Sequence, residues 1–114
     1  MGREENELTV KIIQILKGYG HDVWRQNNIH TPGRAFIGRL GATDVTGITR
    51  HGFRLDIEIK AQGKKPGKEQ QNYGQAMLSR GGAWMWCDSI DSFLLKAMEV
   101  NLINPGRRTN ENVM

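Results

Sequence analysis

Apolar residues recur at the three- and four-residue spacing of a helix in three segments of the chain. In the first segment, Leu8, Ile12 and Leu16 share one helical face, and a glycine follows as a stop signal. Proline is tolerated in the first helical turn, so Pro66 can begin the second helix. The predicted helices run from about Glu4 to Lys17, from near Pro66 to Gly81-Gly82, and from Asp88 or Ser89 through Met98.

Between these helices, apolar residues alternate with polar ones at the two-residue period of a strand. The predicted strands cover residues 21–26, about 44–49, 53–60 and 83–87. Residues 27–40 contain proline and glycine and indicate a loop, with a brief strand at 34–37 as the alternative. The order α-β-β-β-α-β-α predicts one α/β domain over residues 1–104, with a mixed central sheet flanked by helices. Residues 105–114 are expected to form a polar, flexible tail.

The third predicted strand carries charged residues on one of its faces. Because side chains alternate along a strand, the charged face holds Arg54, Asp56, Glu58 and Lys60, opposite Phe53, Leu55, Ile57 and Ile59. Antiparallel pairing with the preceding strand brings Asp44 close to Glu58, so that two carboxylates and the Lys60 ammonium converge. Two alternatives stay open. The charged face can be the solvated side of an amphipathic edge hairpin, or Asp56 can be the working acid in place of Glu58.

This convergence suits a divalent cation and a phosphate. Mg²⁺ and Mn²⁺ favour oxygen ligands and retain several waters, so one or two carboxylates and a substrate phosphate often suffice. Asp44 and Glu58 supply the carboxylates, and the backbone carbonyl of Ile59 can supply a further oxygen. Lys60 can lower the pKa of an attacking water or stabilise charge on the phosphate oxygens. The sequence therefore predicts hydrolysis of nucleic-acid phosphodiesters that depends on Mg²⁺ or Mn²⁺.

The composition of the chain limits the number of domains, the charge of a partner and the cellular compartment. The chain has 114 residues, enough for one core, and a net charge of +4 with a pI near 9.5, which is compatible with an anionic partner. The single cysteine, Cys87, excludes an intrachain disulfide and fits a reducing compartment. No apolar stretch approaches membrane-spanning length, and no zinc-site spacing or Walker-type loop is present in the sequence. We expect a cytoplasmic protein without a membrane partner.

The motifs and their order resemble a known nuclease family. Asp44 followed by Glu58-Ile59-Lys60 resembles the signature of the PD-(D/E)XK nuclease superfamily, with Thr43 replacing the proline that usually precedes the aspartate. More specifically, nearly the whole chain resembles the stand-alone VRR-NUC (virus-type replication-repair nuclease) domains found in phages. The residues that carry this closer resemblance are Glu5, Leu8, Ile12, Leu16, Gly20, the run from Val23 to Asn28, Gly41, Glu69-Gln70, Gly81-Gly82 and Asp88-Ser89.

The resemblance implies a restriction-endonuclease-like core and adds two residues to the site. Its first-helix glutamate, which completes the metal shell, corresponds best to Glu5, with Glu4 and Glu7 as open alternatives. Its helical glutamine, which orients the lysine or a phosphate oxygen, corresponds to Gln70, with Gln71 open. The implied set is Asp44, Glu58, Glu5 and the Ile59 carbonyl for the metal, with Lys60 and Gln70 assisting the chemistry.

The expected substrate is branched DNA. Polar and basic residues in loops beside the site would hold phosphates: Arg25, Asn27, Arg34, Arg39, Lys64, Lys65 and Lys68. Stand-alone members of the family look like Holliday-junction resolvases, and a homodimer would place two sites to nick two strands of a near-symmetric junction. The alternatives are a nuclease of the same chemistry on flaps or other branched DNA, and a non-catalytic nucleic-acid-binding module that retains the fold.

Overall fold

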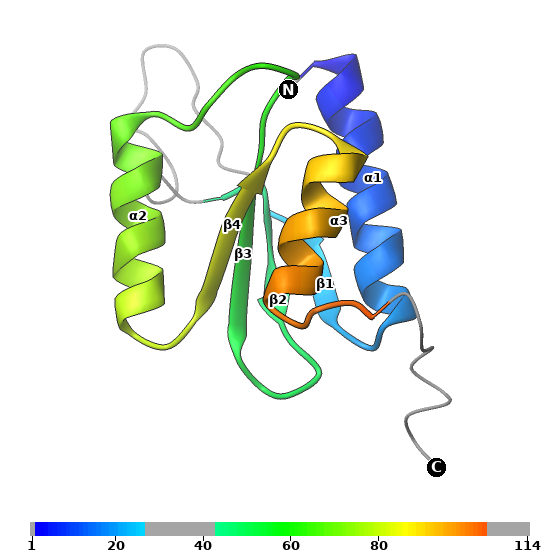
Figure 1. The fold of residues 1–114 in the computed structure, drawn as a ribbon, viewed down its shortest axis with the longest axis vertical. Coiled ribbons are helices and arrows are strands. Elements are labelled where there is room, and N and C mark those ends of the chain that lie inside the picture. The colour runs from blue at the N-terminus through cyan, green and yellow to red at the C-terminus, as the bar shows by residue number, and fades with distance from the viewer. Residues whose placement is uncertain (1, 27–42, 105–114) are drawn as a thin grey trace.

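A four-stranded mixed sheet lies at the centre of the computed structural model, which describes residues 2–26 and 43–104 (Figure 1). The spatial order of the strands follows the sequence: β1 (Asp22–Arg25), β2 (Val45–Ile48), β3 (Arg54–Ile59) and β4 (Ala83–Cys87). β2 is antiparallel to β1 and to β3, whereas β4 is parallel to β3. The predicted mixed sheet is confirmed.

Helices cover both faces of this sheet, as Figure 1 shows. Their bounds are α1 (Arg3–Gly18), α2 (Lys68–Ser79) and α3 (Ile90–Glu99). α1 and α3 pack on one face, and α2 packs on the other. The element order α-β-β-β-α-β-α is therefore the predicted one. The predictions for the 27–40 loop, the 34–37 strand and the 105–114 tail lie outside the described residues.

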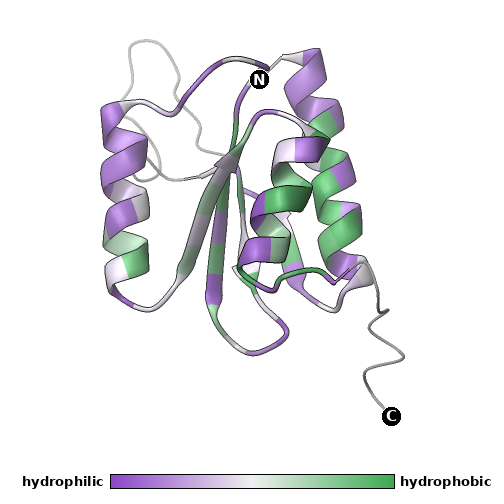
Figure 2. Cartoon of the chain, viewed as in Figure 1, coloured by the Kyte–Doolittle hydropathy of each residue, from purple (hydrophilic) through white to green (hydrophobic). Residues whose placement is uncertain are grey.

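The hydrophobic core lies between the sheet and the α1–α3 layer. α1 contributes an apolar row in which Leu8, Ile12 and Leu16 are buried, and α3 contributes Phe93 and Ala97. Figure 2 shows that hydrophobic residues gather on these two helices, whereas α2 is largely hydrophilic. Burying the α1 and α3 rows against the sheet removes apolar surface from water, which is the main force that holds this layer.

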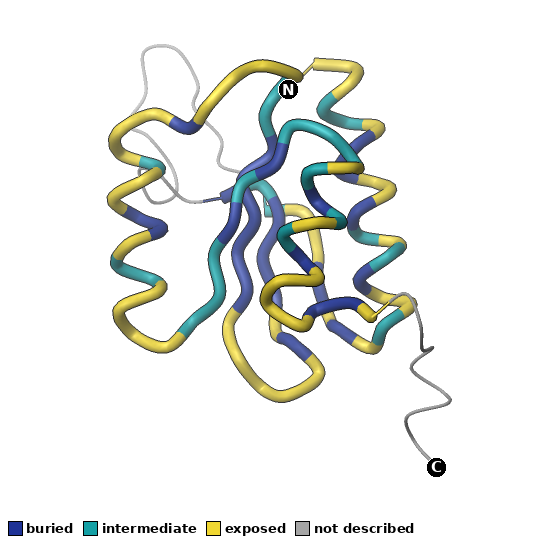
Figure 3. Tube along the Cα trace, viewed as in Figure 1, coloured by how far each residue is buried: buried dark blue, intermediate teal, exposed yellow. Residues whose placement is uncertain are grey.

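β3 is an interior strand, and this corrects one alternative from the sequence. The residues from Leu55 to Ile59 are all buried, including Asp56 with no exposed surface and Glu58 with 3% exposed. Figure 3 shows the central strands as the most deeply buried part of the chain. The solvated edge hairpin is therefore wrong, because β4 pairs along the far side of β3 and α2 covers its charged face. Phe53, placed with the apolar row, precedes the strand and is 57% exposed.

No helix within residues 2–26 and 43–104 is long and apolar enough to cross a membrane.

Candidate active site

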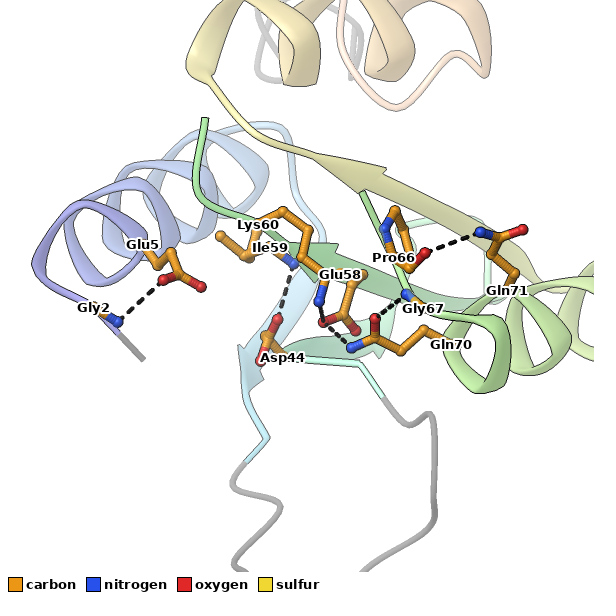
Figure 4. A network of polar contacts seen from close by, with 10 residues as sticks. All are labelled: Gly2, Glu5, Asp44, Glu58, Ile59, Lys60, Pro66, Gly67, Gln70 and Gln71. Carbon is orange, nitrogen blue, oxygen red and sulfur yellow. Dashed lines mark hydrogen bonds and ion pairs between the residues drawn. The ribbon is translucent and has the colours of Figure 1, made fainter. Parts of the chain in front are cut away.

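Asp44 and Glu58 meet where the sheet ends. Val45 pairs with Ile57 in the antiparallel β2–β3 ladder, so the preceding residue, Asp44, falls beside Glu58. The Asp44 carboxylate also crosses to β3, where its Oδ2 accepts the backbone N–H of Ile59 at 2.9 Å (Figure 4). A side chain thus continues the hydrogen-bond ladder one step beyond β2. This contact fixes the Asp44 carboxylate against the strand that carries Glu58.

Glu58 is buried with only part of its hydrogen-bonding capacity used. Its Oε1 accepts the Nε2 amide of Gln70 at 2.8 Å. Its Oε2 is buried and has no hydrogen-bond donor among the described residues. Burial, followed by the charge of Asp44 and by the hydrogen bond that protonated Glu58 donates to the Asp44 carboxylate, raises the pKa of Glu58 from 4.5 to about 9. Two carboxyl groups held this close in a low-dielectric site favour a shared proton or a cation between them.

Lys60 brings a positive charge to the outer side of this pair. Its Nζ lies 3.8 Å from Glu58 Oε1, and its side chain is 22% exposed. The ammonium opposes the rise in the pKa of Glu58, although burial and Asp44 outweigh it. Lys60 follows the last residue of β3, and its N–H donates to the Cys87 carbonyl on β4. The end of the parallel ladder therefore sets the point from which its side chain leaves the sheet.

Gln70, rather than Gln71, reaches the site. Gln70 is the third residue of α2, and its Oε1 accepts the N–H of the N-cap residue Gly67 at 2.8 Å while its Nε2 donates to Glu58. One amide thus caps the helix and binds the carboxylate at the same time. Gln71 points elsewhere, because its Nε2 donates to the Pro66 carbonyl at 2.9 Å. Figure 4 shows the two side chains diverging.

Glu5 lies at the margin of the site. It is the third residue of α1, its Oε1 accepts the Gly2 N–H at 3.2 Å, and its negative charge adds to the rise in the pKa of Glu58. Glu7 forms an exposed ion pair with Arg3 at 3.3 Å instead. Glu4 and Glu7 line a separate cleft of about 190 Å³, which they share with Lys60. Of the three glutamates, only Glu5 acts electrostatically on Glu58.

The oxygen atoms at this end of the sheet fit a small divalent cation. Within the described residues, no three His, Cys, Asp or Glu side chains form a metal-binding group. The candidate donors are instead Asp44, Glu58 and the Ile59 carbonyl. In a strand, the N–H and C=O of one residue point to the same side, so the Ile59 carbonyl faces Asp44 as its N–H does. The buried Glu58 Oε2 without a donor fits a cation ligand. Two carboxylates and a carbonyl suffice where waters and a phosphate complete an octahedron.

Asp56 contacts Tyr73 and Arg54 rather than Lys60 or Gln70. Its side chain has no exposed surface, and its Oδ2 accepts the Tyr73 hydroxyl at 2.9 Å and lies 3.4 Å from Arg54 Nε. The alternative that assigned the acid role to Asp56 is therefore unsupported. The contact with Tyr73 was missed from the sequence. One feature of the sequence could have indicated this contact: Tyr73 follows Gln70 by three residues, which places both on the same side of a helix.

All three helices begin at the site end of the sheet. The first turn of α1 contains Glu5, α2 follows the loop that leaves β3, and α3 begins directly after β4 (Figure 1). The N-terminus of a helix carries a partial positive charge and unpaired N–H groups. Three such ends in one region favour an approaching anion, beyond what the net charge of +4 alone provides.

The predicted phosphate-binding residues are only partly described. Lys64 and Lys65 are exposed in the loop between β3 and α2, and Lys68 is the exposed first residue of α2. All three therefore flank Gln70. Arg25 ends β1 at the site end and donates to Asn6 Oδ1 at 2.9 Å. The predictions for Asn27, Arg34 and Arg39 lie outside the described residues.

Comparison with known proteins identifies the fold. No protein-family model matches the sequence, and no curated protein matches it. A solved structure described as a VRR_NUC domain does match: 86% of this chain superposes on 97% of that chain with a TM-score of 0.62 and 20% sequence identity. The chain therefore has the fold of that VRR_NUC domain, as the resemblance of the motifs predicted.

Proposed function

We propose that this chain is a divalent-metal-dependent endodeoxyribonuclease that cleaves four-way DNA junctions as a homodimer. The observation that carries the proposal is the Asp44–Glu58 pair at the end of β3, with Lys60 and Gln70 around it, on a VRR_NUC fold. Glu58 has a buried oxygen without a donor in the described part of the chain, although an interior strand is a costly place for one. Thr46 Oγ1, Asp56 Oδ1 and Trp84 Nε1 are also buried without a partner in that part of the chain. The Glu58 oxygen supports the proposal because it stands beside a second carboxyl group and an ammonium.

The geometry supports the following roles. Asp44, Glu58 and the Ile59 carbonyl would hold Mg²⁺ or Mn²⁺, with Glu5 positioned to add a ligand through water. A bound ion would supply Lewis acidity and lower the pKa of the attacking water. Lys60 would stabilise negative charge on the phosphate oxygens, because its ammonium stands at the exposed rim of the pair. Gln70 would hold the Glu58 carboxylate in one orientation.

The first test uses a labelled four-way junction, a flap and a plain duplex, each with Mg²⁺, Mn²⁺ or EDTA. We expect paired, metal-dependent nicks in the junction. Asp44→Asn retains an acceptor for the Ile59 N–H, and Lys60→Met retains the length of the side chain, so neither removes a packing contact. Each should lower the rate by at least roughly a hundredfold. Matched controls are Asp22→Asn and Lys17→Met, at exposed positions toward the opposite end of the sheet, which should cleave as the wild type does.

The homodimer has its own test. Wild-type and Asp44→Asn chains are mixed in varying ratios before the junction is added. A dimer with one active site per chain should produce junctions nicked on one strand only, in proportion to the mixed dimers. Sedimentation of the unmixed protein should give twice the monomer mass. Monomers on the junction would contradict the dimer and leave the nuclease assignment intact.

The other outcomes identify the rival functions. Faster cleavage of flaps than of junctions would assign the same chemistry to another branched target. Tight junction binding without cleavage in either metal would make the chain a non-catalytic binding module. Cleavage that persists in EDTA would overturn the role given to Asp44 and Glu58.

A further inference from the structure

Asp56 is a fully buried carboxylate that the proposed chemistry leaves without a role. It stands two residues before Glu58 on the same face of β3, and both lie under α2. Tyr73 donates its hydroxyl to Asp56 Oδ2, and Tyr73 itself is only 7% exposed. Burying a carboxylate is expensive unless it is paired and hydrogen-bonded. Arg54, on the same strand, lies 3.4 Å from the same oxygen, so the contact that joins Asp56 to another element is the one with Tyr73.

The contact holds a helix whose fully buried surface is small. Among its twelve residues, α2 buries only Tyr73 and Gly74. A Cβ atom at Gly74 would come within 2.3 Å of the Trp84 ring, so the helix backbone lies directly on that indole. The remaining face of α2 is largely polar (Figure 2). Where the apolar anchor is this small, one buried hydrogen bond has a large share in fixing the position of the helix.

The two polar contacts between α2 and β3 form a matched pair. Gln70 and Tyr73 are three residues apart on one side of the helix, and they bind Glu58 and Asp56, which are two residues apart on one face of the strand. Rotation or sliding of α2 that breaks one contact also strains the other. We infer that Asp56 and Tyr73 are positioning residues of the site: their hydrogen bond sets the register of α2 on β3 and so places the Gln70 amide on the Glu58 carboxylate.

The expected effect on the cleavage rate rests on the proposed function, whereas the expected shift of α2 on β3 does not. Loss of the Tyr73 hydroxyl should free α2 to shift, so that the Gln70 amide meets Glu58 for a smaller fraction of the time. Small misplacements of a positioned group lower the rate of the chemical step more than they weaken substrate binding. Tyr73→Phe should therefore lower kcat roughly tenfold with little change in KM.

The test compares Tyr73→Phe with Tyr19→Phe, the same change at the other tyrosine of the chain. ¹⁵N-correlated NMR spectra report the side-chain amide of Gln70, identified by its loss in Gln70→Ala. In Tyr73→Phe this signal should move toward the position of an exposed glutamine such as Gln75, and in Tyr19→Phe it should stay in place. Asp56→Asn, which removes the charge and retains an acceptor, should give a smaller shift in the same direction.

A double-mutant cycle then asks whether Tyr73 acts through Gln70. In the Gln70→Ala background, Tyr73→Phe should change kcat by less than about twofold, because the group it positions is gone. Equal losses in both backgrounds would overturn the inference, as would an unmoved Gln70 amide in Tyr73→Phe. If the wild type cleaves no substrate and the amide still shifts, the proposed function fails while the positioning role stands.

Discussion

Buried polar groups at the two ends of the sheet differ in whether their hydrogen bonds are complete. At the end opposite the site, His21 is 3% exposed and uses both ring nitrogens. Its Nδ1 accepts the Arg50 N–H at 2.9 Å, so the proton resides on Nε2, which faces the Leu102 carbonyl at 2.6 Å. At the site end, Glu58 retains a buried oxygen without a donor in the described residues.

His21 is thus satisfied by the fold itself, whereas Glu58 retains the capacity for a further partner, which under the proposed function is a cation. The His21 ring joins the β2–β3 turn to the segment after α3, and its hydrogen bonds are complete within the chain. The carboxyl groups of Asp44 and Glu58 repel each other when both are charged, so the site stores unfavourable free energy that a cation would relieve. Substitutions at the two ends should therefore have opposite effects on stability.

The largest effect is expected for Glu58→Gln in EDTA. The pKa of Glu58 is about 9 in the folded chain against 4.5 for an ordinary glutamate, so the folded state binds the extra proton between these values. The contribution of Glu58 to stability is accordingly greatest below pH 4.5 and is lost as the pH rises toward 9. Glutamine does not titrate, and the variant should gain on the order of several kcal/mol relative to the wild type by pH 9.

Urea unfolding at pH 5 and pH 9 measures this gain. Glu99→Gln, at the exposed end of α3, serves as the control and should follow the wild type at both pH values. Added Mg²⁺ should stabilise the wild type at high pH and leave Glu58→Gln unchanged. Parallel curves for the wild type and Glu58→Gln would mean that Glu58 is not protonated in the folded chain.

At the opposite end, His21→Leu should destabilise the protein by about 3 kcal/mol at pH 7.5, because it removes two buried hydrogen bonds and leaves their partners unpaired. Cleavage by the variant, measured below its unfolding temperature, should stay at the wild-type rate. His51 lies exposed in the β2–β3 turn, and His51→Leu should change stability by less than about 0.5 kcal/mol. Equal effects of the two substitutions would show that the His21 contacts contribute nothing.

A smaller effect on stability is expected at acidic pH. Burial lowers the pKa of His21 below 6.5, and the charge of Arg50 acts in the same direction, although the Leu102 carbonyl opposes it. The folded state prefers the neutral ring, so this contribution to stability is present above pH 6.5 and is lost as the pH falls through the lowered value. As the pH falls from 6.5 to 5, the wild type should lose more stability than His21→Leu does. A constant difference across that range would contradict the lowered pKa.

The sequence predicted the elements of the fold because each has a local signal. The apolar row of α1, the alternation around Glu58 and the glycines after α2 all act within a few residues. The burial of Asp56 had no such signal, since alternation treats a charged face as solvated whether or not a helix later covers it. The sequence also left Gln70 and Gln71 undecided, because a rotation of α2 by one residue distinguishes them. Only packing against β3 sets that rotation.

The smallest predicted effect tests whether the site end alone faces the nucleic acid. Lys65 is exposed in the loop that leads into α2, and Lys17 is exposed in the last turn of α1, at the opposite end. If DNA lies across the site end, Lys65→Ala should weaken junction binding and reduce the slope of log K against log salt by about one phosphate contact. Lys17→Ala removes the same charge and should leave the slope unchanged. A screened effect of net charge alone would lower affinity in both variants equally, because the two substitutions change the total charge by the same amount. Measurement of junction affinity in EDTA at four salt concentrations separates a local contact from a general attraction.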